Sequence, residues 1–186
     1  MAAKDYYIFT DCDLDGAGSY LAFSWLTGLT DIPYMVCRVN DLEKKLTGWL
    51  KTHKFEDYKK VYFFDLDVSK EGIKKLIDRD NVVVVDHHLS NIESEVEFKK
   101  ASMVVEDTTS TCKLLYKTFK DKAPELTNEQ KLFIYMVDDY DSYTLKLAES
   151  KKLNDVFWSY QGNRVEKLER DFSSGFTGFN RFHENT

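Results

Sequence analysis

The sequence predicts an α/β protein with a Rossmann-like, mainly parallel five-stranded sheet flanked by helices and a helical C-terminal part. Two observations carry this prediction. Apolar runs of strand length alternate with helical patterns through the first two-thirds of the 186 residues. Several of these runs are continuous and rich in β-branched residues, as expected of strands that are buried on both faces of a parallel sheet.

The alternating part of the chain contains five runs that are expected to form strands. They cover residues 6–9, 34–39, 61–64, 82–85 and, as a weaker run, 103–105. Helical patterns follow four of these strands, at residues 17–29, at residues 42–50 with Asn40 or Asp41 as cap, after Ser69 as cap, and at residues 110–119. This order of elements is typical of βαβ units.

After Pro124 the alternation stops and the pattern becomes helical. Thr127 and Gln130 form a capping box for a helix that should run to about Asp139. Two further helices are expected at residues 153–160 and 165–172, and the tail from residue 173 has no clear period. We expect one domain over residues 1–186, with about 1–122 as the sheet core and about 123–186 as the helical C-terminal part.

Composition and charge exclude several classes of protein. Hydrophobic residues make up 42% of the chain, which is enough for a sizeable core, but no run approaches the ~20 apolar residues of a membrane helix. The net charge of −6 argues against a general nucleic-acid coating protein. Cys12, Cys37 and Cys112 are odd in number and form no CxxC pair, and the N-terminus has no signal-like apolar stretch. These features favour reduced thiols and a cytoplasmic protein.

Acidic residues and histidines follow three of the expected strands. They are Asp11, Asp13 and Asp15 after the first strand, Asp65 and Asp67 after the third, and Asp86, His87 and His88 after the fourth. Because the carboxyl ends of parallel strands share one edge of a sheet, these side chains should lie close together. Clustered aspartates repel each other and require cations. Mixed Asp and His ligands suit Mn²⁺, Mg²⁺, Fe²⁺ or Zn²⁺, and several carboxylates can bridge two ions ~3.5–4 Å apart.

Two other interpretations compete for the first acidic segment. Its pattern of alternating aspartates before Gly16 also opens a calcium EF-hand loop, but that loop needs a Glu at its twelfth position, which is Ala22 here, and a preceding helix. We therefore reject it. The segment also resembles the haloacid-dehalogenase phosphatases, in which Asp13 would be the nucleophile and Asp15 a general acid. This alternative leaves His87 and His88 unexplained, but it stays open from the sequence alone.

Four motifs, in order over about residues 6–143, resemble the DHH phosphoesterase family, which includes RecJ-type exonucleases, nanoRNases, cyclic-dinucleotide phosphodiesterases and manganese pyrophosphatases. The first motif is Thr10-Asp11-Cys12-Asp13-Leu14-Asp15-Gly16, the second Phe64-Asp65, the third Asp86-His87-His88, and the fourth Val137-Asp138-Asp139-Tyr140-Asp141. A single Asp-His-His would be weak, but four ordered motifs are specific.

The resemblance implies a set of metal ligands. One metal would be held by Asp15, Asp65, His87 and Asp139, and a second by Asp13 together with Asp65 as the bridging ligand. Some members carry a further His at the position of Phe9; here either Asp11 would substitute or the second metal would bind more weakly. In the fourth motif Asp138, Asp139 and Asp141 are alternatives, and Asp139 is preferred because Tyr143 then follows four residues later, as in the family.

The resemblance also implies roles around the metals. His88 would face the phosphate, and Asp86 would orient the histidine pair from behind. Gly16 and Ser19 open the first helix, where backbone N–H groups are expected to meet phosphate oxygens.

The implied activity is hydrolysis of phosphodiester or phosphoanhydride bonds with manganese, two Mn²⁺ ions being expected and Mg²⁺ the alternative. Nucleotides or short single-stranded nucleic acids rank first as substrates, before cyclic dinucleotides and pyrophosphate. The substrate-gripping domain of many members has no clear counterpart, although Gly175 to His183 is a short candidate, and a homodimer partner could supply it. A binding module that sequesters a nucleotide without hydrolysing it is the alternative of a different class.

Overall fold

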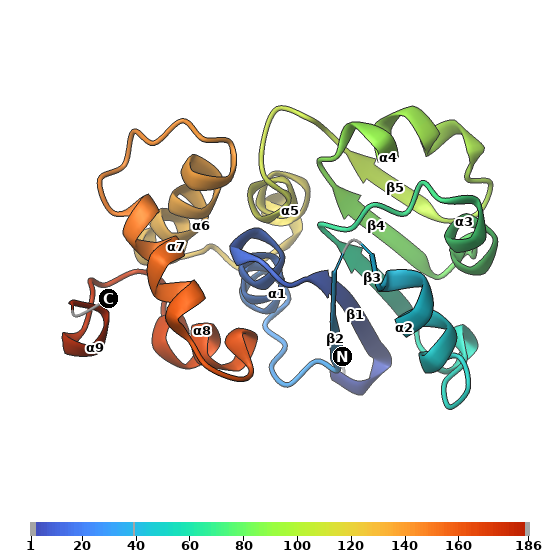
Figure 1. Ribbon diagram of the computed structural model, residues 1–186, viewed down its shortest axis with the longest axis horizontal. Coiled ribbons are helices and arrows are strands. Elements are labelled where there is room, and N and C mark those ends of the chain that lie inside the picture. Colours follow the sequence, from blue (N-terminus) through green and yellow to red (C-terminus); the bar gives the residue numbers. More distant parts are fainter. Residues whose placement is uncertain (1–2, 39, 185–186) are drawn as a thin grey trace.

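Five strands form one parallel sheet in the order β2-β1-β3-β4-β5 (Figure 1). The computed structural model describes residues 3–38 and 40–184. The strands are β1 (Tyr6–Asp11), β2 (Tyr34–Cys37), β3 (Lys60–Phe64), β4 (Val82–Asp86) and β5 (Ser102–Val105). All four neighbouring pairs are parallel. The predicted five-stranded α/β fold is confirmed.

The sheet has a separate hydrophobic core on each face, because successive side chains along a strand point to opposite sides. On β1, Ile8 belongs to one core and its neighbour Phe9 to the other. On β4, Val85 and Val84 divide in the same way. All four are fully buried, which explains why the strands appear in the sequence as continuous apolar runs.

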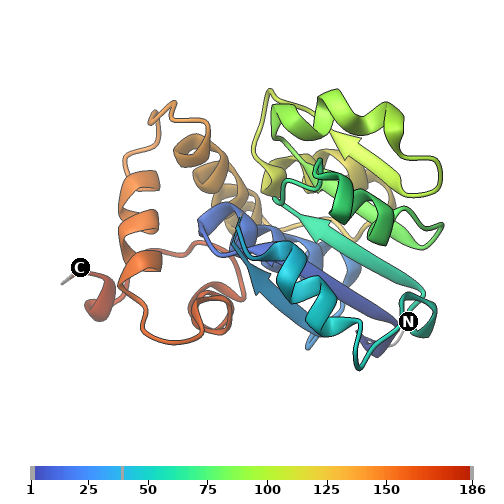
Figure 2. The same cartoon turned by 45° about the vertical axis from the view of Figure 1, so that its right-hand side comes forward.

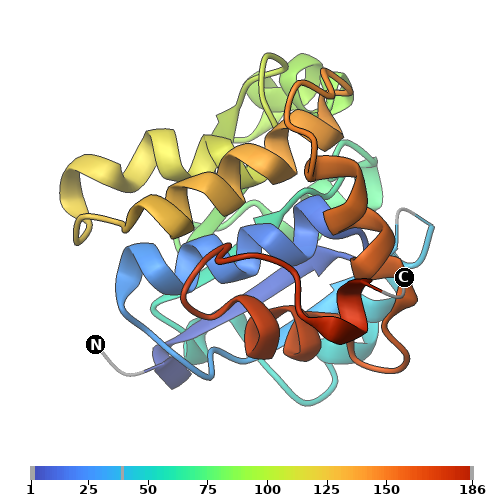
Figure 3. The same cartoon turned by 90° about the vertical axis from the view of Figure 1, so that its left-hand side faces the viewer.

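Helices cover both faces of the sheet. One face packs against α2 (Leu42–Trp49) and α3 (Glu71–Ile77), and the other against α1 (Leu14–Thr27) and α5 (Thr111–Phe119). Figure 3 shows α6 (Asn128–Asp141) beside α1 and α5, with α7 (Ser150–Ser159) and α8 (Arg164–Phe172) beyond them. The remaining elements are the short helices α4 (Leu89–Ser94) and α9 (Arg181–Glu184) and the 3-10 turns η1 (Ala3–Asp5), η2 (Phe55–Asp57), η3 (Glu95–Glu97) and η4 (Lys120–Lys122).

The ends of the elements follow local chemistry. The predicted capping box of α6 is confirmed, since the Thr127 hydroxyl accepts from the Gln130 N–H and the Gln130 side chain accepts from the Thr127 N–H. Ser69 does not cap α3, because its N–H donates to Asp67 in the preceding turn and the helix begins after Lys70. The short helix α4 was not predicted. Val39, expected at the end of the second strand, lies outside the described residues, as do residues 1–2 and 185–186.

The order of the strands creates a crevice at the carboxyl edge of the sheet. The chain leaves β1 toward β2 on one side, and β3 then pairs with β1 on the other side. The connections after β1 and β3 therefore diverge, and ligands of open α/β sheets bind at such a point. Figure 2 shows α7 and α8, in orange, standing beside this edge. No helix of the described residues is long and apolar enough to cross a membrane, and the three cysteines are free.

The C-terminal tail is held by a polar cluster around Asp171 of α8. The Tyr160 hydroxyl donates to the Asp171 carboxylate at 2.7 Å, and the His183 Nε2 lies 3.0 Å from the same oxygen. Arg170 donates to the second oxygen at 2.6 Å. The His183 side chain is buried and its ring stacks on Phe172. The segment from Gly175 to His183 thus ends in a packed cluster.

We predict that Asp171→Asn removes a pH-dependent part of the stability. Burial opposes ionisation of Asp171, but hydrogen bonds from Arg170, Tyr160 and His183 outweigh that effect and lower its pKa to about 2. Because this pKa lies below the unfolded value of about 3.9, the stabilisation is present above pH ~4 and is lost as the pH falls toward 2. Urea unfolding at pH 7 should show a loss of about 1–2 kcal/mol, discounted for solvent screening.

The control is Asp155→Asn at an exposed position of α7, which should change the free energy of unfolding by less than about 0.5 kcal/mol. Equal pH profiles for wild type and Asp171→Asn between pH 2 and 5 would contradict the prediction.

Candidate metal centre

Seven acidic or imidazole side chains meet at the carboxyl edge of the sheet. Their ligand atoms fall into three groups, in each of which all atoms lie within 4.8 Å of one another. The groups are Asp15, His87 and Asp141; Asp65, His87 and His88; and Asp11, Asp13 and Asp65. Since His87 and Asp65 each belong to two groups, the three groups form one continuous cluster.

His87 lies at the centre of this cluster. Its Nε2 is 3.3 Å from an oxygen of Asp65, 3.5 Å from one of Asp141 and 3.9 Å from one of Asp15. These carboxylates come from the end of β3, the end of α6 and the first turn of α1. Three distant parts of the sequence therefore present donor atoms around one imidazole nitrogen.

Asp15 is positioned by the N-terminus of α5. One of its oxygens accepts from the Thr111 N–H at 2.8 Å and the other from the Cys112 N–H at 2.9 Å. The residue is buried, and burial, followed by the nearby charges of Asp141 and Asp13, raises the pKa of Asp15 well above its usual value. The two amide donors fix the carboxylate but do not offset this cost.

Asp65 occupies a backbone conformation that is uncommon for residues other than glycine. Its φ of 57° lies in the left-handed region, which costs a residue with a Cβ about 1–3 kcal/mol. The turn directs the side chain toward His87 directly after β3. The pKa of Asp65 is also raised well above its usual value, first by burial and then by the charges of Asp15, Asp13, Asp86 and Asp141.

The first acidic segment turns sharply between β1 and α1. Asp13 caps α1, accepting from the Gly16 N–H at 2.9 Å, and Asp11 ends β1. A Cβ at Gly16 would lie 2.5 Å from the Asp11 carbonyl oxygen, so this turn requires glycine. Burial raises the pKa of Asp11.

Gly16 and Ser19 were expected to contact phosphate oxygens, but the structure places neither residue where it could do so. The Gly16 N–H is already bonded to Asp13, and Ser19 is fully buried within α1, where its hydroxyl has no hydrogen-bond partner among the described residues. The structure does not bring either group to the surface of the cluster. The helical phase of α1 turns Ser19 toward the interior.

The three aspartates at the end of α6 have different surroundings. Asp138 accepts from the Thr109 hydroxyl, the Ser110 N–H and the Lys113 ammonium, and so binds α6 to the start of α5. Asp141 lies in the cluster, and its Oδ2 is buried without a hydrogen-bond partner in the described part of the chain.

Asp139, the preferred ligand of the fourth motif, is not brought into the cluster. Its carboxylate accepts from the Thr144 and Ser150 hydroxyls and from the N–H groups of Lys146 and Leu147. Burial opposes ionisation of Asp139, but these four bonds outweigh it and strongly lower its pKa. The carboxylate holds the loop that follows α6, and Asp141 is the aspartate of the fourth motif that lies in the cluster.

His88 and Asp86 form a pair behind the cluster. The His88 Nδ1 lies 2.7 Å from Asp86, which is fully buried and also accepts from the His88 N–H. Because a carboxylate only accepts, Nδ1 carries the proton and Nε2 is left for another partner. The hydrogen bond to Asp86 raises the pKa of His88.

Two supporting residues were missed by the sequence analysis. Asn91 of α4 is fully buried, donates to Asp86 and to the Leu66 carbonyl, and accepts from the Val68 N–H. It joins the loop after β3 to the loop after β4. Thr111 contacts both Asp15 and Asp65. Thr111 was expected only as part of the helix at residues 110–119, and nothing in the sequence marks Asn91.

Phe9 belongs to the hydrophobic core. Its ring stacks on Phe63 with centroids 4.8 Å apart and meets the edge of Trp49. The side chain points away from the cluster, toward α2. Asp11 is the residue of β1 that joins Asp13 and Asp65.

The donor set of this cluster fits divalent cations. Its members are carboxylate oxygens and imidazole nitrogens, which suit Mn²⁺ and Mg²⁺ or other first-row ions. Buried carboxylates with raised pKa values, and the Oδ2 of Asp141, which accepts no hydrogen bond from the described residues, are stabilised by positive charge. A bound cation would supply that charge.

The chain was compared with known proteins. It matches the family model described as the DHH family, N-terminal domain, over residues 5–142. Among solved structures it is similar to an uncharacterized protein from Helicobacter pylori G27, with a TM-score of 0.61 and 14% identity over 88% of this chain and 50% of that one. CDC45 from Entamoeba histolytica gives a TM-score of 0.49 and 16% identity over 74% of this chain and 30% of that one.

The first of these similarities shows a shared fold. The chain spans about half the length of the Helicobacter pylori protein. No curated protein matches the sequence.

We predict opposite effects for two neighbouring aspartates of α6. Asp141→Asn should weaken Mn²⁺ binding by roughly 10–100-fold in calorimetric titration, because it removes a carboxylate of the cluster. Without metal its unfolding temperature should equal or exceed that of the wild type, because a buried repulsion is relieved. Asp139→Asn should instead lower the free energy of unfolding by about 2–3 kcal/mol, because its charge-assisted hydrogen bonds are weakened. Loss of Mn²⁺ affinity in Asp139→Asn alone would reverse the assignment.

Proposed function

The chain belongs to the DHH family, whose members are metal-dependent phosphoesterases, and we propose that it hydrolyses phosphodiester or phosphoanhydride bonds with two Mn²⁺ ions, Mg²⁺ being the alternative. One observation carries this proposal: carboxylates from β3, α6 and α1 surround the Nε2 of His87 within 3.9 Å. Such convergence of buried acids is costly in a protein that binds no cation.

The geometry supports a division of the ligands between two sites. Asp15, His87 and Asp141 would hold one ion and Asp11 and Asp13 the other, with Asp65 shared between them. When bound, such ions lower the pKa of a water molecule and neutralise charge on the phosphoryl oxygens. Asp141 replaces Asp139 in this proposal.

His88 would donate a hydrogen bond to the substrate. Its Nδ1 proton is engaged by Asp86, its side chain is 40% exposed, and the raised pKa favours a proton on Nε2 as well. An imidazolium at this place would bind a phosphoryl oxygen and stabilise the negative charge that develops there. Asp86 and Asn91 act as positioning residues, because they fix the plane of the ring.

The substrates proposed first are short oligonucleotides or linear dinucleotides, followed by cyclic dinucleotides and pyrophosphate. A hollow of about 170 Å³ beside the cluster is lined by Asp13, Asp15 and Asp141 and by the aromatic Tyr140 and Trp158. Aromatic rings next to a phosphate-binding site support stacking of bases. The homodimer and the cytoplasmic location stay predictions.

Two alternatives have less support. A phosphatase with Asp13 as nucleophile gives no role to Asp65, His87 and Asp141, and it requires a covalent phosphoaspartate that our proposal excludes. A binding module that sequesters a nucleotide would not need a complete set of ligands.

Release of phosphate or mononucleotides from dinucleotides, cyclic dinucleotides, single strands and pyrophosphate with Mn²⁺ tests the proposal. No hydrolysis of any of them by Mn²⁺-loaded protein would favour the binding module.

We expect Asp65→Ala and His87→Ala to lower kcat/KM with Mn²⁺ by at least ~10³-fold, because each removes a ligand that two groups share. Circular dichroism should show an intact fold for both. The control is Asp121→Ala in η4, an exposed position whose variant should retain wild-type activity. Full activity in either test variant would refute the ligand assignment.

His88→Ala should separate substrate binding from metal binding. We expect kcat to fall by roughly 10²–10³-fold, because a hydrogen-bond donor to the phosphoryl group is lost. Mn²⁺ affinity, measured by calorimetry, should stay within about threefold of the wild type, since Nδ1 is bonded to Asp86. A loss of Mn²⁺ affinity as large as in His87→Ala would make His88 a ligand instead.

A further inference from the structure

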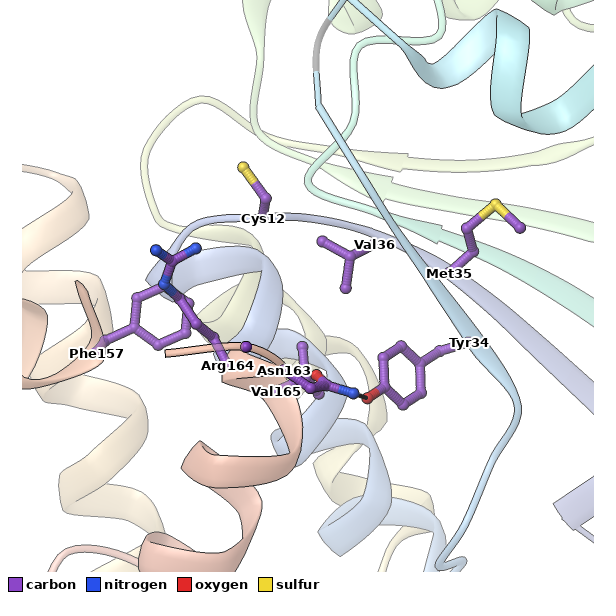
Figure 4. A pocket seen from close by; sticks show the side chains of 9 residues that line it. Cys12, Tyr34, Met35, Val36, Phe157, Asn163, Arg164 and Val165 are labelled. Carbon is purple, nitrogen blue, oxygen red and sulfur yellow. Dashed lines mark hydrogen bonds between the residues drawn. The ribbon is translucent and has the colours of Figure 1, made fainter. Parts of the chain in front are cut away.

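A pocket of about 430 Å³ lies between β2 and the start of α8, next to the candidate metal centre (Figure 4). Cys12 forms part of its wall, and the residues on either side of Cys12 are the predicted ligands Asp11 and Asp13. The pocket therefore borders the segment that carries two of the predicted ligands. The volume is within the range of small-molecule sites.

Arg164 is the cationic residue among those that line the pocket. Its Nε is buried and has no hydrogen-bond partner among the described residues. Its guanidinium carbon lies 4.8 Å from the centre of the Trp158 ring, and Trp158 also borders the hollow beside Asp13 and Asp15. In Figure 4 the guanidinium lies beside the ring of Phe157, on the side of the pocket where Cys12 stands.

The Nε of Arg164 therefore has no hydrogen-bond acceptor among the described residues, although the residue lies close to the acidic cluster. An unpaired buried N–H costs free energy that an oxygen acceptor would recover. The planar fork of arginine matches a phosphate group in particular. Arg164 is held at the first position of α8, where the Asn163 side chain caps the helix by accepting from the Glu166 N–H.

The opposite wall of the pocket is apolar and aromatic. It contains Tyr34 and Val36 of β2. The Tyr34 hydroxyl accepts from the Asn163 side chain at 2.7 Å, which fixes its ring across the pocket from Arg164 (Figure 4). A cation beside an aromatic and aliphatic wall suits a ligand that joins a phosphate to a flat, apolar ring.

We propose that this pocket binds the nucleotide next to the scissile phosphate, with Arg164 pairing with its non-scissile phosphate and the wall of Tyr34 and Val36 receiving its base. This inference rests on the proposed function. Phe157 and Arg164 lie beyond residues 5–142 that the family model matches. The subsite is thus a contribution of the C-terminal helices of this chain to the recognition of substrate.

The test compares Arg164→Gln with Lys167→Gln, which removes a charge from the same helix but from a residue that does not line the pocket. With a 5′-phosphorylated linear dinucleotide and Mn²⁺, Arg164→Gln should raise KM at least ~10-fold and change kcat less, while Lys167→Gln follows the wild type. Arg164→Lys should be intermediate, since it keeps the charge but loses the planar fork.

A second readout needs no metal and no turnover. Adenosine 5′-monophosphate and adenosine are titrated into the metal-free protein and followed by tryptophan fluorescence. We expect Arg164→Gln to weaken binding of the monophosphate at least ~10-fold and that of adenosine little. Val36→Trp fills the pocket and should therefore weaken binding of both the monophosphate and adenosine. This variant provides the test if Arg164→Gln does not fold.

The outcomes separate this inference from the proposed function. If the wild type hydrolyses phosphoesters but Arg164→Gln behaves like Lys167→Gln in both readouts, the subsite is overturned and the proposed function stands. If the wild type hydrolyses nothing but monophosphate binding depends on Arg164 and Val36, the subsite stands and the proposed function fails. Absence of monophosphate binding to the wild type at millimolar concentration also overturns the subsite.

Discussion

Repulsion among buried carboxylates at the carboxyl edge of the sheet is the constraint on which the rest of the site depends. Two unit charges 4 Å apart repel by ~4 kcal/mol at an effective dielectric constant of 20, and five aspartates belong to the cluster around His87. The chain offsets part of this repulsion by placing Asp15 on the N–H groups that open α5. Burial, followed by the repulsion from neighbouring aspartates, raises the pKa values of Asp15, Asp65 and Asp141. A cation would convert this unfavourable arrangement into a stabilising one.

The fold holds this arrangement because the carboxylates lie on, or directly after, strands and helices of the core. The order β2-β1-β3-β4-β5 opens the sheet between β1 and β3, so the loops after these strands face one another. The left-handed backbone of Asp65 then directs a carboxylate into the crevice. The packing of the buried strands on either side offsets the conformational free energy that this backbone requires. Asn91 links the loops after β3 and β4 and prevents them from moving apart.

The fold was predictable from the sequence because both faces of the sheet are buried and the strands appear as continuous apolar runs. The capping box of α6 was also predictable, because it depends only on two residues that are three positions apart. The sequence did not predict which of Asp138, Asp139 and Asp141 joins the cluster, because all three lie within one turn of a helix. Only the packing of the loop around Asp139 and of α5 against Asp138 decides which carboxylate is left for the cluster. The role of Asn91 was not predicted either, because its hydrogen-bond partners lie far from it in the sequence or in another loop.

The end of α6 connects the candidate metal centre to the part of the chain that would bind substrate. Asp139 holds the loop that leads to Ser150, and Ser150 opens α7, which carries Phe157 and Trp158. Asp141, two residues from Asp139, is a proposed ligand. A shift of this loop would therefore move the ligand and the pocket wall together. Because both depend on one helix end, the distance between a bound phosphate and Arg164 would be set by α6 and α7.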